Sequence, residues 1–481
     1  MPRGYATLAM VPEFLYPRGM GVRIATSILM MAALTAPALG QQRALERAVA
    51  AAEAQGVRTG VVVCTEDADI LYRHRAGELF APASNMKVLT AAVTLSRLGR
   101  DYQFVTDFSV VDGVLCVRAS GDPNWISGTE HDPEVVLGAV GAALRSRGVL
   151  ALRGVSLDAG VFTGPSRPAT WPQDQLYAYY CAPTGAFVLQ QGTFVIAISA
   201  SGGRDARARL ISPPAGYPIR GAIREVASSK GATYGAIDEG QTVRVRGKFY
   251  AKSPRVEIKT SVRDPARWFE DTLVEQIARV GVSVSSAAPQ PDLGVVYRCK
   301  TPLAAALRRM LEDSSNFDAE QCLRVLGAEA SDDGSLAGGV RAMRQGIAAL
   351  VGRVPAGVVL ADGSGLSKEN RITPGLLVVA MYELEKLGLS DELLRHLPVA
   401  GQSGTLRRRF VGGALAGKVR AKTGWIRGAS SLSGVVERSG GDRCWFSILM
   451  NYDRSRGAMN KGLKKLQEDM VAAVHAWKGS R

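Results

Sequence analysis

The chain has little histidine, no closely spaced pair of cysteines and no zinc-protease motif, and these shortages exclude several classes of enzyme. Its 481 residues include four histidines, which are scattered, and no HExxH sequence occurs. A zinc hydrolase needs His, Cys, Asp or Glu ligands at characteristic spacings. The sequence therefore disfavours metal-dependent hydrolysis and implies neither a metal nor an organic cofactor.

The cysteines also lack the CxxC spacing of redox and metal sites. The six thiols lie far apart, at Cys64, Cys116, Cys181, Cys299, Cys322 and Cys444. In an exported protein they could form disulfides. In a chain of this length, isolated buried thiols are an equally good interpretation, and the sequence alone does not pair them.

No run of basic residues is interleaved with aromatic residues, although the formal net charge is +15. Single-stranded nucleic-acid sites combine basic grooves with stacking aromatic side chains, so nucleic acid is not an expected partner. The basic residues are spread along the chain instead. This spread favours a generally basic surface, suited to an anionic cell wall, over a local binding patch.

The sequence also lacks an apolar run long enough to span a bilayer with ease. From Met20 it carries the features of a signal peptide, with Arg23 before the apolar run 24–34 and a small-x-small cleavage site at 38–40. We expect residues 1–40 to be a signal peptide with a spurious extension before Met20, and export to the periplasm or another extracytoplasmic space. The alternative is a buried helix.

Helical and strand-like segments alternate in blocks, with no internal repeat. The hydrophobic fraction of 46% is typical of a folded protein, and the length predicts more than one structural unit. Residues 106–262 are rich in short alternating strands separated by Gly, Pro and Asp. We predict an α+β catalytic domain with an antiparallel sheet, formed by residues 41–105 and 263–481, and a β-rich insertion of residues 106–262.

The final helical segment carries an apolar stripe at helical spacing. Its members are Leu463, Leu466, Met470, Val474 and Trp477. A helix packed on the sheet is the favoured interpretation. Because lysines flank the stripe, peripheral contact with a membrane surface is the alternative.

Ser84 and Lys87 form the first candidate catalytic motif. Pro82 precedes an apolar run, which predicts that a helix begins near Ser84, and Gly99 suits the end of that helix. A serine and a lysine three residues apart share one face of a helix. A lysine can act as the base for a serine only if burial lowers its pKa. By itself the tetrapeptide is weak, since a solvated first turn would look the same.

Two further short motifs carry polar groups that suit peptide chemistry. Ser314 and Asn316 lie in a loop between helical segments, where a turn or helix cap would also explain them. Lys422, Thr423 and Gly424 lie in a strand-like run. Lysine and threonine can bind a carboxylate, while glycine lets a substrate backbone lie close to an edge strand.

The three motifs S-x-x-K, S-x-N and K-T-G occur in order, each in its expected structural context. This set is that of penicillin-binding proteins and serine β-lactamases. The chain resembles the DacB-like D-alanyl-D-alanine carboxypeptidase/endopeptidases, the low-molecular-mass class C penicillin-binding proteins. The long stretch between Ser84 and Ser314 matches that family's habit of inserting two extra domains. Four further stretches are similar to it, namely 120–123, 180–186, 362–374 and 397–410.

The resemblance implies a β-lactamase/transpeptidase-like fold with a two-module insertion, and a role for each motif residue. It implies that Ser84 is acylated by the D-Ala-D-Ala carbonyl and that Lys87 takes its proton. Ser314 relays the proton to the leaving amine, while Asn316 holds Lys87 and the substrate amide.

At the third motif, the resemblance implies that Lys422 and Thr423 bind the terminal carboxylate beside Gly424. The N–H groups of Ser84 and Trp425 would form the oxyanion hole. The implied partners are peptidoglycan peptides as substrate and β-lactams as inhibitors.

Two departures from the family pattern concern substrate recognition. Relatives read the free amine of the stem peptide with an aspartate in a Trp-x-x-x-Asp context. Asp174 follows Trp171 at slightly different spacing, so it is either that residue or part of a surface turn. Trp425 is also bulkier than the residue usually found there.

Two rival functions remain open at the level of sequence. One is a β-lactamase or esterase of the same fold, against which the long insertion argues. The other is a catalytically inactive wall-binding protein, against which the complete motif set argues.

Overall fold

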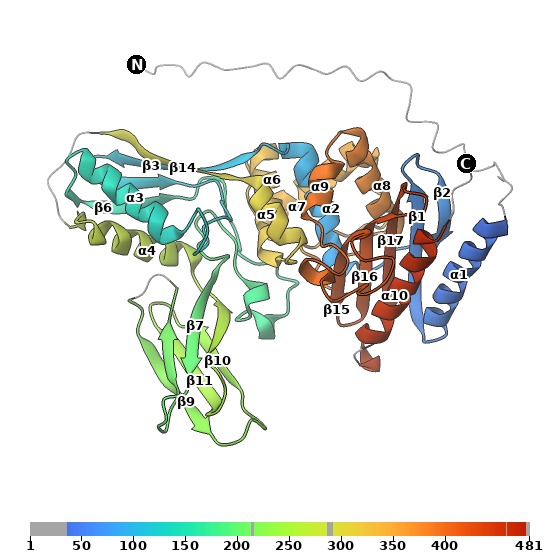
Figure 1. Ribbon diagram of the computed structural model, residues 1–481. Coiled ribbons are helices and arrows are strands. Elements are labelled where there is room, and N and C mark those ends of the chain that lie inside the picture. Colours follow the sequence, from blue (N-terminus) through green and yellow to red (C-terminus); the bar gives the residue numbers. More distant parts are fainter. Residues whose placement is uncertain (1–35, 213–215, 286–291, 458, 478–481) are drawn as a thin grey trace, which may run out of the picture.

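The computed structural model describes residues 36–212, 216–285, 292–457 and 459–477. Figure 1 shows an elongated molecule with a sheet and its helices at one end. A second sheet with two helices lies at the other end, and a smaller all-strand lobe projects beneath it. The termini of the described chain lie close together beside the first sheet (Figure 1).

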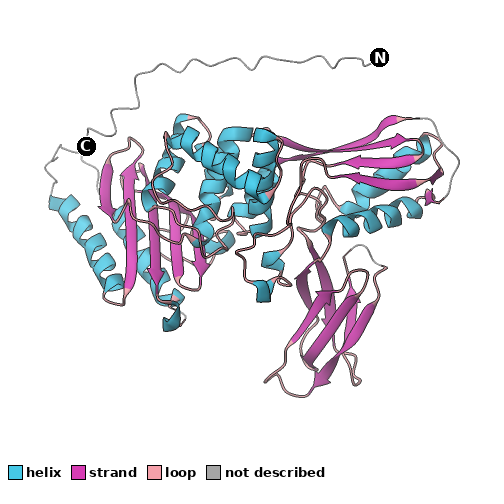
Figure 2. Ribbon diagram, turned by 180° about the vertical axis from the view of Figure 1, so that it is seen from behind, coloured by secondary structure: helices cyan, strands magenta, loops and turns pink. Residues whose placement is uncertain are grey.

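The first sheet has five strands, all antiparallel to their neighbours. Its order is β15 (Val419–Ile426), β16 (Ala429–Glu437), β17 (Arg443–Tyr452), β1 (Val57–Thr65) and β2 (Ile70–His74). Strands from both ends of the chain thus pair in its middle, and β15 forms one edge. Figure 2 shows helices on both faces of this sheet.

Strand alternation divides the buried side chains of this sheet between two cores. One face is covered by α1 (Ala36–Glu53) and α10 (Asn460–His475). The opposite face packs against a helical half that includes α2 (Met86–Leu98), α5 (Leu303–Leu311), α6 (Asn316–Ser331), α7 (Leu336–Val351), α8 (Pro374–Lys386) and α9 (Ser390–His396). The catalytic motifs lie on this helical side.

The insertion begins with a four-stranded sheet backed by two helices. Its strand order is β14 (Gly294–Pro302), β3 (Gln103–Val111), β4 (Val114–Arg118) and β6 (Gly154–Asp158). The helices are α3 (Pro133–Ser146) and α4 (Pro265–Arg279), which pack on each other and on the sheet. A short parallel pair, β5 (Ala151–Leu152) with β13 (Ser283–Val284), extends this module.

The second module of the insertion is built from two three-stranded sheets around one core. One sheet has the order β12 (Val256–Ser261), β7 (Thr193–Ser199) and β8 (Arg207–Leu210). The other has the order β10 (Tyr234–Asp238), β11 (Val243–Tyr250) and β9 (Ile219–Val226). This module is the projecting lobe in Figure 1.

The sequence-based boundary at residue 262 divides the first inserted module. Helix α4 lies beyond that boundary, yet Phe269, Leu273 and Ile277 pack into the same core as α3. Strand β14 also lies beyond it and pairs with β3 along its whole length. The helical pattern of the sequence beyond residue 262 suggested that these elements belong to the catalytic domain. In the structure, α4 and β14 instead pack and pair with elements of the insertion. We propose limits for the insertion near residues 103 and 302.

The fold class predicted from the sequence, α+β with an antiparallel sheet and a two-module insertion, is the one observed. The final helix follows the favoured interpretation. Leu463, Met470 and Val474 are buried against the sheet and α1, so the stripe faces protein and not a membrane surface.

All six cysteines are unpaired thiols, so the interpretation as isolated thiols applies and the one as disulfides does not. Five are buried and Cys116 is partly exposed. Cys64 and Cys444 lie on neighbouring strands but on opposite faces of the sheet, in separate cores. Because their side chains point apart, this pair cannot be bridged without moving the backbone.

Most of the expected signal peptide lies outside the described residues. Its end, the small-x-small site at 38–40, falls in the first turns of α1. Among the described helices, none combines the length and apolar character that crossing a membrane requires.

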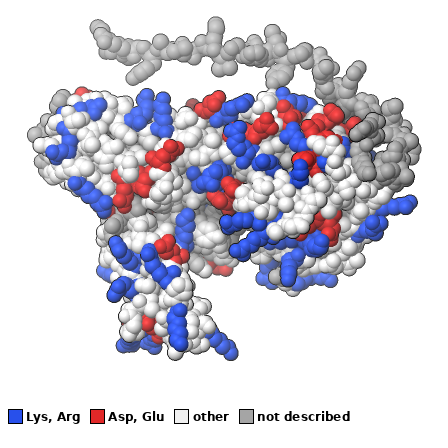
Figure 3. Space-filling model, in the orientation of Figure 1, with Lys and Arg blue, Asp and Glu red and all other residues white. Residues whose placement is uncertain are grey.

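Basic side chains are scattered over the face of the molecule shown in Figure 3, with acidic side chains among them. They cover both the catalytic end and the projecting lobe. This distribution agrees with a generally basic surface.

Candidate active site

Ser84 lies in a single 3₁₀ turn, Ala83–Asn85, that leads directly into α2. Ala83 has a φ of +50°, a conformation that costs energy for a residue with a side chain. Such strain persists only where the surroundings impose it, and it gathers at functional sites. Here the backbone of Gly365 packs directly on the Ala83 carbonyl, so a loop from far along the chain fixes the turn.

Asn85 attaches this turn to the edge of the sheet. Its buried side chain donates from Nδ2 to the Lys422 carbonyl at 2.6 Å and accepts from Ser433 Oγ at 3.0 Å. Ser431 Oγ donates to the Pro82 carbonyl at 2.7 Å. These contacts bring the S-x-x-K and K-T-G motifs together. Sequence analysis missed Asn85, because nothing local distinguishes it from a residue of a helix start.

Lys87 is fully buried, and its amine has three partners. Nζ lies 3.1 Å from Ser84 Oγ, 2.7 Å from Asn316 Oδ1 and 2.8 Å from the carbonyl oxygen of Ser364. Burial lowers the pKa of Lys87 to about 7, against the opposing effect of the Asp362 and Glu320 carboxylates. A large share of the lysine is therefore neutral near pH 7 and can accept the serine proton.

Ser314 is held in the site by its backbone and by Lys422. It lies between α5 and α6 with a φ of +62°, and Ser315 beside it caps α6. Lys422 Nζ donates to Ser314 Oγ at 2.8 Å and to the Thr423 carbonyl at 2.9 Å. Burial and the nearby Lys87 hold the pKa of Lys422 well below its ordinary value.

Strand β15 brings its backbone unusually close to Ser84. A Cβ added at Gly424 would collide with Ser431 Oγ and lie 2.9 Å from the Ser84 nitrogen. Only glycine fits this approach. The next residue, Trp425, leaves 51% of its surface exposed beside this contact.

Thr405 lies next to the K-T-G motif, where sequence analysis gave it no role. Its hydroxyl is 2.8 Å from the Thr423 hydroxyl. It belongs to the short 3₁₀ turn Gly404–Leu406, inside a stretch noted only for its family resemblance. Two hydroxyl groups thus stand together beside Lys422.

Asp174 lies in the exposed 3₁₀ turn Gln173–Gln175. The carbonyl of nearby Tyr180 accepts a hydrogen bond of 2.8 Å from Asn316 Nδ2, so this inserted segment borders the site. Burial raises the pKa of the Tyr180 phenol, and the Asp174 carboxylate is the last of several smaller contributions in the same direction. The structure thus brings the three motifs into direct contact and leaves Asp174 at the rim.

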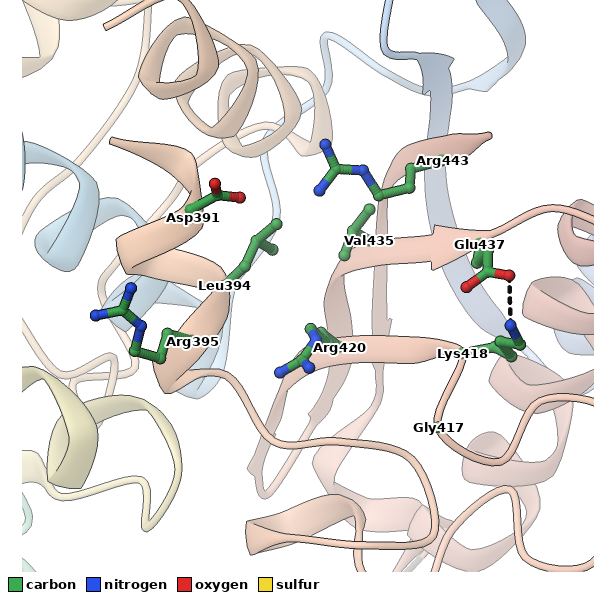
Figure 4. Close-up of a pocket in the computed structure, with 9 residues that line it drawn as sticks. All are labelled: Asp391, Leu394, Arg395, Gly417, Lys418, Arg420, Val435, Glu437 and Arg443. Carbon is green, nitrogen blue, oxygen red and sulfur yellow. Dashed lines mark hydrogen bonds and ion pairs between the residues drawn. The ribbon is translucent and has the colours of Figure 1, made fainter. Parts of the chain in front are cut away.

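A polar pocket of about 390 Å³ lies between α9 and the strands β15–β17, and no motif residue lines it. Figure 4 shows Arg395 and Arg420 on opposite sides of it and Arg443 on a third. Within the described residues, no group of three His, Cys, Asp or Glu side chains is placed to hold a metal ion. The three motifs therefore meet outside this pocket.

The comparisons with known proteins agree with this geometry. The model of the D-Ala-D-Ala carboxypeptidase 3 (S13) family matches residues 41–472. A D-alanyl-D-alanine carboxypeptidase of Actinomadura sp. (strain R39) is 30% identical over 431 residues, with 82% of this chain and 78% of the relative covered. The chain belongs to the S13 family. The DacB-like resemblance and the enzyme class expected from the sequence, a serine-type D-Ala-D-Ala carboxypeptidase, are confirmed.

Solved structures share the fold of this S13 member. The crystal structure of penicillin binding protein 4 (dacB) from Haemophilus influenzae has a TM-score of 0.75 and 20% identity, covering 90% of this chain and 99% of that one. The structure of the same protein complexed with a β-lactam has a TM-score of 0.72 over the same shares of both chains, also at 20% identity. The transpeptidase-like architecture with its insertion is thereby confirmed.

Proposed function

We propose that this S13 enzyme removes the terminal D-alanine of peptidoglycan stem peptides through an acyl-enzyme on Ser84. The observation that carries the proposal is the contact of 3.1 Å between Ser84 Oγ and the buried amine of Lys87. A lysine is a useful base at neutral pH only when it is desolvated, and this one is.

Acylation follows from the contacts in the site. Ser84 Oγ attacks the carbonyl carbon between the two D-alanines while neutral Lys87 takes its proton. The N–H groups of Ser84 and Trp425 stabilise the oxyanion, a contribution of about 3 to 4 kcal/mol for each such donor in other enzymes. Ser314 passes a proton to the leaving amine, and D-alanine departs. Water then hydrolyses the ester and regenerates Ser84.

Asn316 and the carboxylate-binding residues set the orientation of the peptide. Asn316 Oδ1 accepts a hydrogen bond from Lys87 Nζ at 2.7 Å, and we assign to its side-chain amide the role of holding the substrate amide. Lys422 and Thr423 bind the terminal carboxylate, and the adjacent Thr405 hydroxyl supports Thr423. Gly424 allows the peptide backbone to lie against β15. This assignment explains why two buried lysines occupy one cleft.

Asp174 is proposed to bind the free amine of the stem peptide. Its exposed carboxylate lies on the inserted segment that contacts Asn316 through Tyr180. An amine-bearing side chain that extends from the cleft would reach this rim.

The same cleft accounts for inhibition by β-lactams. A β-lactam carbonyl presents the same reactive carbon to Ser84, but the amine leaving group stays attached to the acyl product. Retention of that group blocks the approach of water and leaves the enzyme acylated. The solved relative that contains a β-lactam supports this proposal.

We also propose that the protein is exported and acts in the periplasm or another extracytoplasmic space. The family match begins at residue 41, directly after the small-x-small site at 38–40. Peptidoglycan lies outside the cytoplasmic membrane, so an enzyme that trims it must be exported.

Labelling with a fluorescent penicillin tests the nucleophile. The full chain should form one adduct that maps to Ser84, and Ser84→Ala should form none. Rapid turnover of nitrocefin without a stable adduct would contradict the proposal and favour a β-lactamase.

Incubation with muropeptides tests the substrate. Mass spectrometry should show loss of one terminal alanine with the full chain and no change with Ser84→Ala. Splitting of cross-linked dimers would add endopeptidase action to the same site.

A further inference from the structure

The carbonyl of Ser364 is the partner of Lys87 that the mechanism above leaves without a role. Serine and asparagine partners can exchange hydrogen bonds with substrate, but a backbone carbonyl only accepts. At 2.8 Å from Nζ, this buried acceptor fixes where the amine stands relative to Ser84. The position of the Lys87 amine therefore depends on the contacts that hold the Ser364 peptide in place.

Two buried carboxylates hold the loop that carries this carbonyl. Glu320 of α6 accepts from the backbone N–H groups of Gly363 at 3.1 Å and Ser364 at 2.8 Å. Asp362 accepts from the N–H groups of Gly365 at 2.7 Å and Ser367 at 2.6 Å.

Neither carboxylate can exchange these partners for water, because both side chains are buried. Leaving a buried N–H without an acceptor costs the full desolvation of that group. Asn370, also buried, adds a 2.7 Å hydrogen bond from its Nδ2 to Asp362. The loop is thus clamped on both sides of Ser364.

The fourth donor to Asp362 comes from the inserted domain. The indole N–H of Trp171 lies 2.9 Å from Asp362 Oδ2, and Trp171 is 2% exposed. Trp171 stands three residues before Asp174, at the start of the segment that borders the cleft. One carboxylate therefore joins the inserted segment to the peptide that seats the catalytic base.

We propose that Asp362 is a positioning residue that couples the inserted domain to Lys87, through the Trp171 indole on one side and the Ser364 carbonyl on the other. Glu320 completes the clamp. This inference rests on the function proposed above. It assigns to Trp171 a role in the chemistry of Ser84 even for substrates that have no amine for Asp174 to bind.

The test measures the second-order rate of Ser84 acylation by benzylpenicillin, which carries no free amine. Trp171→Phe keeps an aromatic ring but removes the indole N–H and part of the indole volume, as Trp268→Phe does in the control pair below, and should slow acylation by up to about 10-fold. Asp362→Asn removes acceptors from the loop and should slow acylation by roughly 10- to 100-fold.

The inserted lobe supplies matched controls. Asp238 is buried and accepts from Trp268 Nε1 at 3.0 Å and from the backbone N–H groups of Arg263 and Gly240, at 2.6 Å and 2.8 Å. This arrangement reproduces the Asp362–Trp171 pair far along the chain from the motifs. Asp238→Asn and Trp268→Phe should cost similar stability and leave the acylation rate unchanged.

The pH profile separates positioning from a general loss of structure. The titratable groups that face Lys87 are Glu320 from α6, whose pKa burial raises to about 8, Asp362 from the loop and Lys422 from β15, whose pKa burial lowers. The Asp362 carboxylate raises the pKa of Lys87, so Asp362→Asn should move the acid limb of the profile to lower pH. Asp238→Asn should not move it.

The rates and pH profiles of these variants test the positioning by Asp362 and the coupling to the insertion separately. Rates for Trp171→Phe and Asp362→Asn equal to those of their controls, with an unshifted profile, would overturn the proposal. A normal rate for Trp171→Phe alone would overturn the coupling to the insertion. If Asp362→Asn did not fold, the acylation rate of Trp171→Phe, compared with that of Trp268→Phe, would test the proposal by itself. Absence of any Ser84 adduct on the wild-type chain would instead refute the proposed function.

Discussion

At the scale of single residues, two buried lysines in one cleft set the chemistry. Lys87 and Lys422 are both without solvent exposure, and the charge of Lys87 lowers the pKa of Lys422 in addition to the effect of burial. A protein interior disfavours two such charges together. A substrate carboxylate that binds beside Lys422 would therefore favour the charged form of that lysine.

The pKa of Lys87 predicts the pH dependence of acylation. Because the base must be neutral and its pKa is about 7, the second-order rate should fall about tenfold per pH unit below pH 7. Rates of penicillin acylation between pH 5 and pH 9 give this profile, with circular dichroism showing that the chain stays folded. A rate that is flat down to pH 5 would be inconsistent with lysine as the base.

Gly424→Ala should abolish most activity without a change in charge. The new methyl group would meet Ser431 Oγ and the Ser84 nitrogen, forcing β15 away from the nucleophile. We expect acylation to slow by roughly 100-fold, since a displacement of about 1 Å can have that effect on a catalytic geometry.

The matched control for that substitution is Gly235→Ala in β10. An added Cβ there meets nothing within 4 Å, so penicillin labelling should match the wild type. Equal labelling of both variants would show that the close approach at Gly424 has no catalytic importance.

At the scale of elements, one face of the five-stranded sheet is covered by α1 and α10, which come from opposite ends of the chain. Helix α10 is fixed to the S-G-T-L-R-R-R segment by the buried Arg409. Its guanidinium donates to Glu468 Oε1 at 2.8 Å, Gln467 Oε1 at 3.2 Å and the Lys464 carbonyl at 3.0 Å. That segment also carries Thr405, so the helix supports one wall of the carboxylate site.

Arg409→Met should destabilise the fold by roughly 2 to 4 kcal/mol. Methionine fills the space but leaves the buried Gln467 side chain and two partly buried acceptors of α10 without the arginine donor. Thermal unfolding followed by circular dichroism should show a clearly lower melting temperature. Arg408→Met, at the exposed neighbouring position, is the control and should melt like the wild type. An unchanged melting temperature for Arg409→Met would mean that these bonds contribute nothing net.

At the scale of the whole molecule, the projecting lobe is a separate unit joined by two adjacent strands. Thr193 and Ser261 are partners in the ladder between β7 and β12, so both connections leave the lobe at one point. Its core is separate from that of the first inserted module except at α4, where Trp268 packs into the lobe and Asp271 accepts from the Tyr217 hydroxyl at 2.6 Å. Ser261 contacts the segment that carries Asp174, through the carbonyl oxygens of Tyr177 and Leu176.

Replacing residues 194–260 by Gly-Gly should therefore give a protein that still binds penicillin. A two-residue turn suits an antiparallel pair in register, and it preserves the bonds of Ser261. We expect Ser84 acylation within about 3-fold of wild type, measured with fluorescent penicillin, since no described residue of the deleted stretch forms a hydrogen bond with any of the three motifs. A folded variant that no longer labels would show that the lobe supports the cleft.

How far the sequence predicts this protein depends on how local each feature is. The start of α2 near Ser84, the loop at Ser314 and the strand at Lys422 each follow from short patterns, and so does the family resemblance. The insertion was also predicted, and the limits near residues 103 and 302 proposed above differ from its predicted limit at residue 262. The helical periodicity of α4 predicts which face of the helix is apolar. It does not predict that this face packs into the core of the insertion and not into that of the catalytic domain.

The sequence by itself determined which groups do the chemistry, because side-chain type and spacing are local properties. Only the tertiary structure decided what surrounds them. The partners that desolvate, seat and orient Lys87, such as Ser364, Asp362 and Trp171, come from distant segments. Their roles depend on burial and on distances of about 3 Å, which arise when separate stretches pack together. No pattern within any one stretch encodes them.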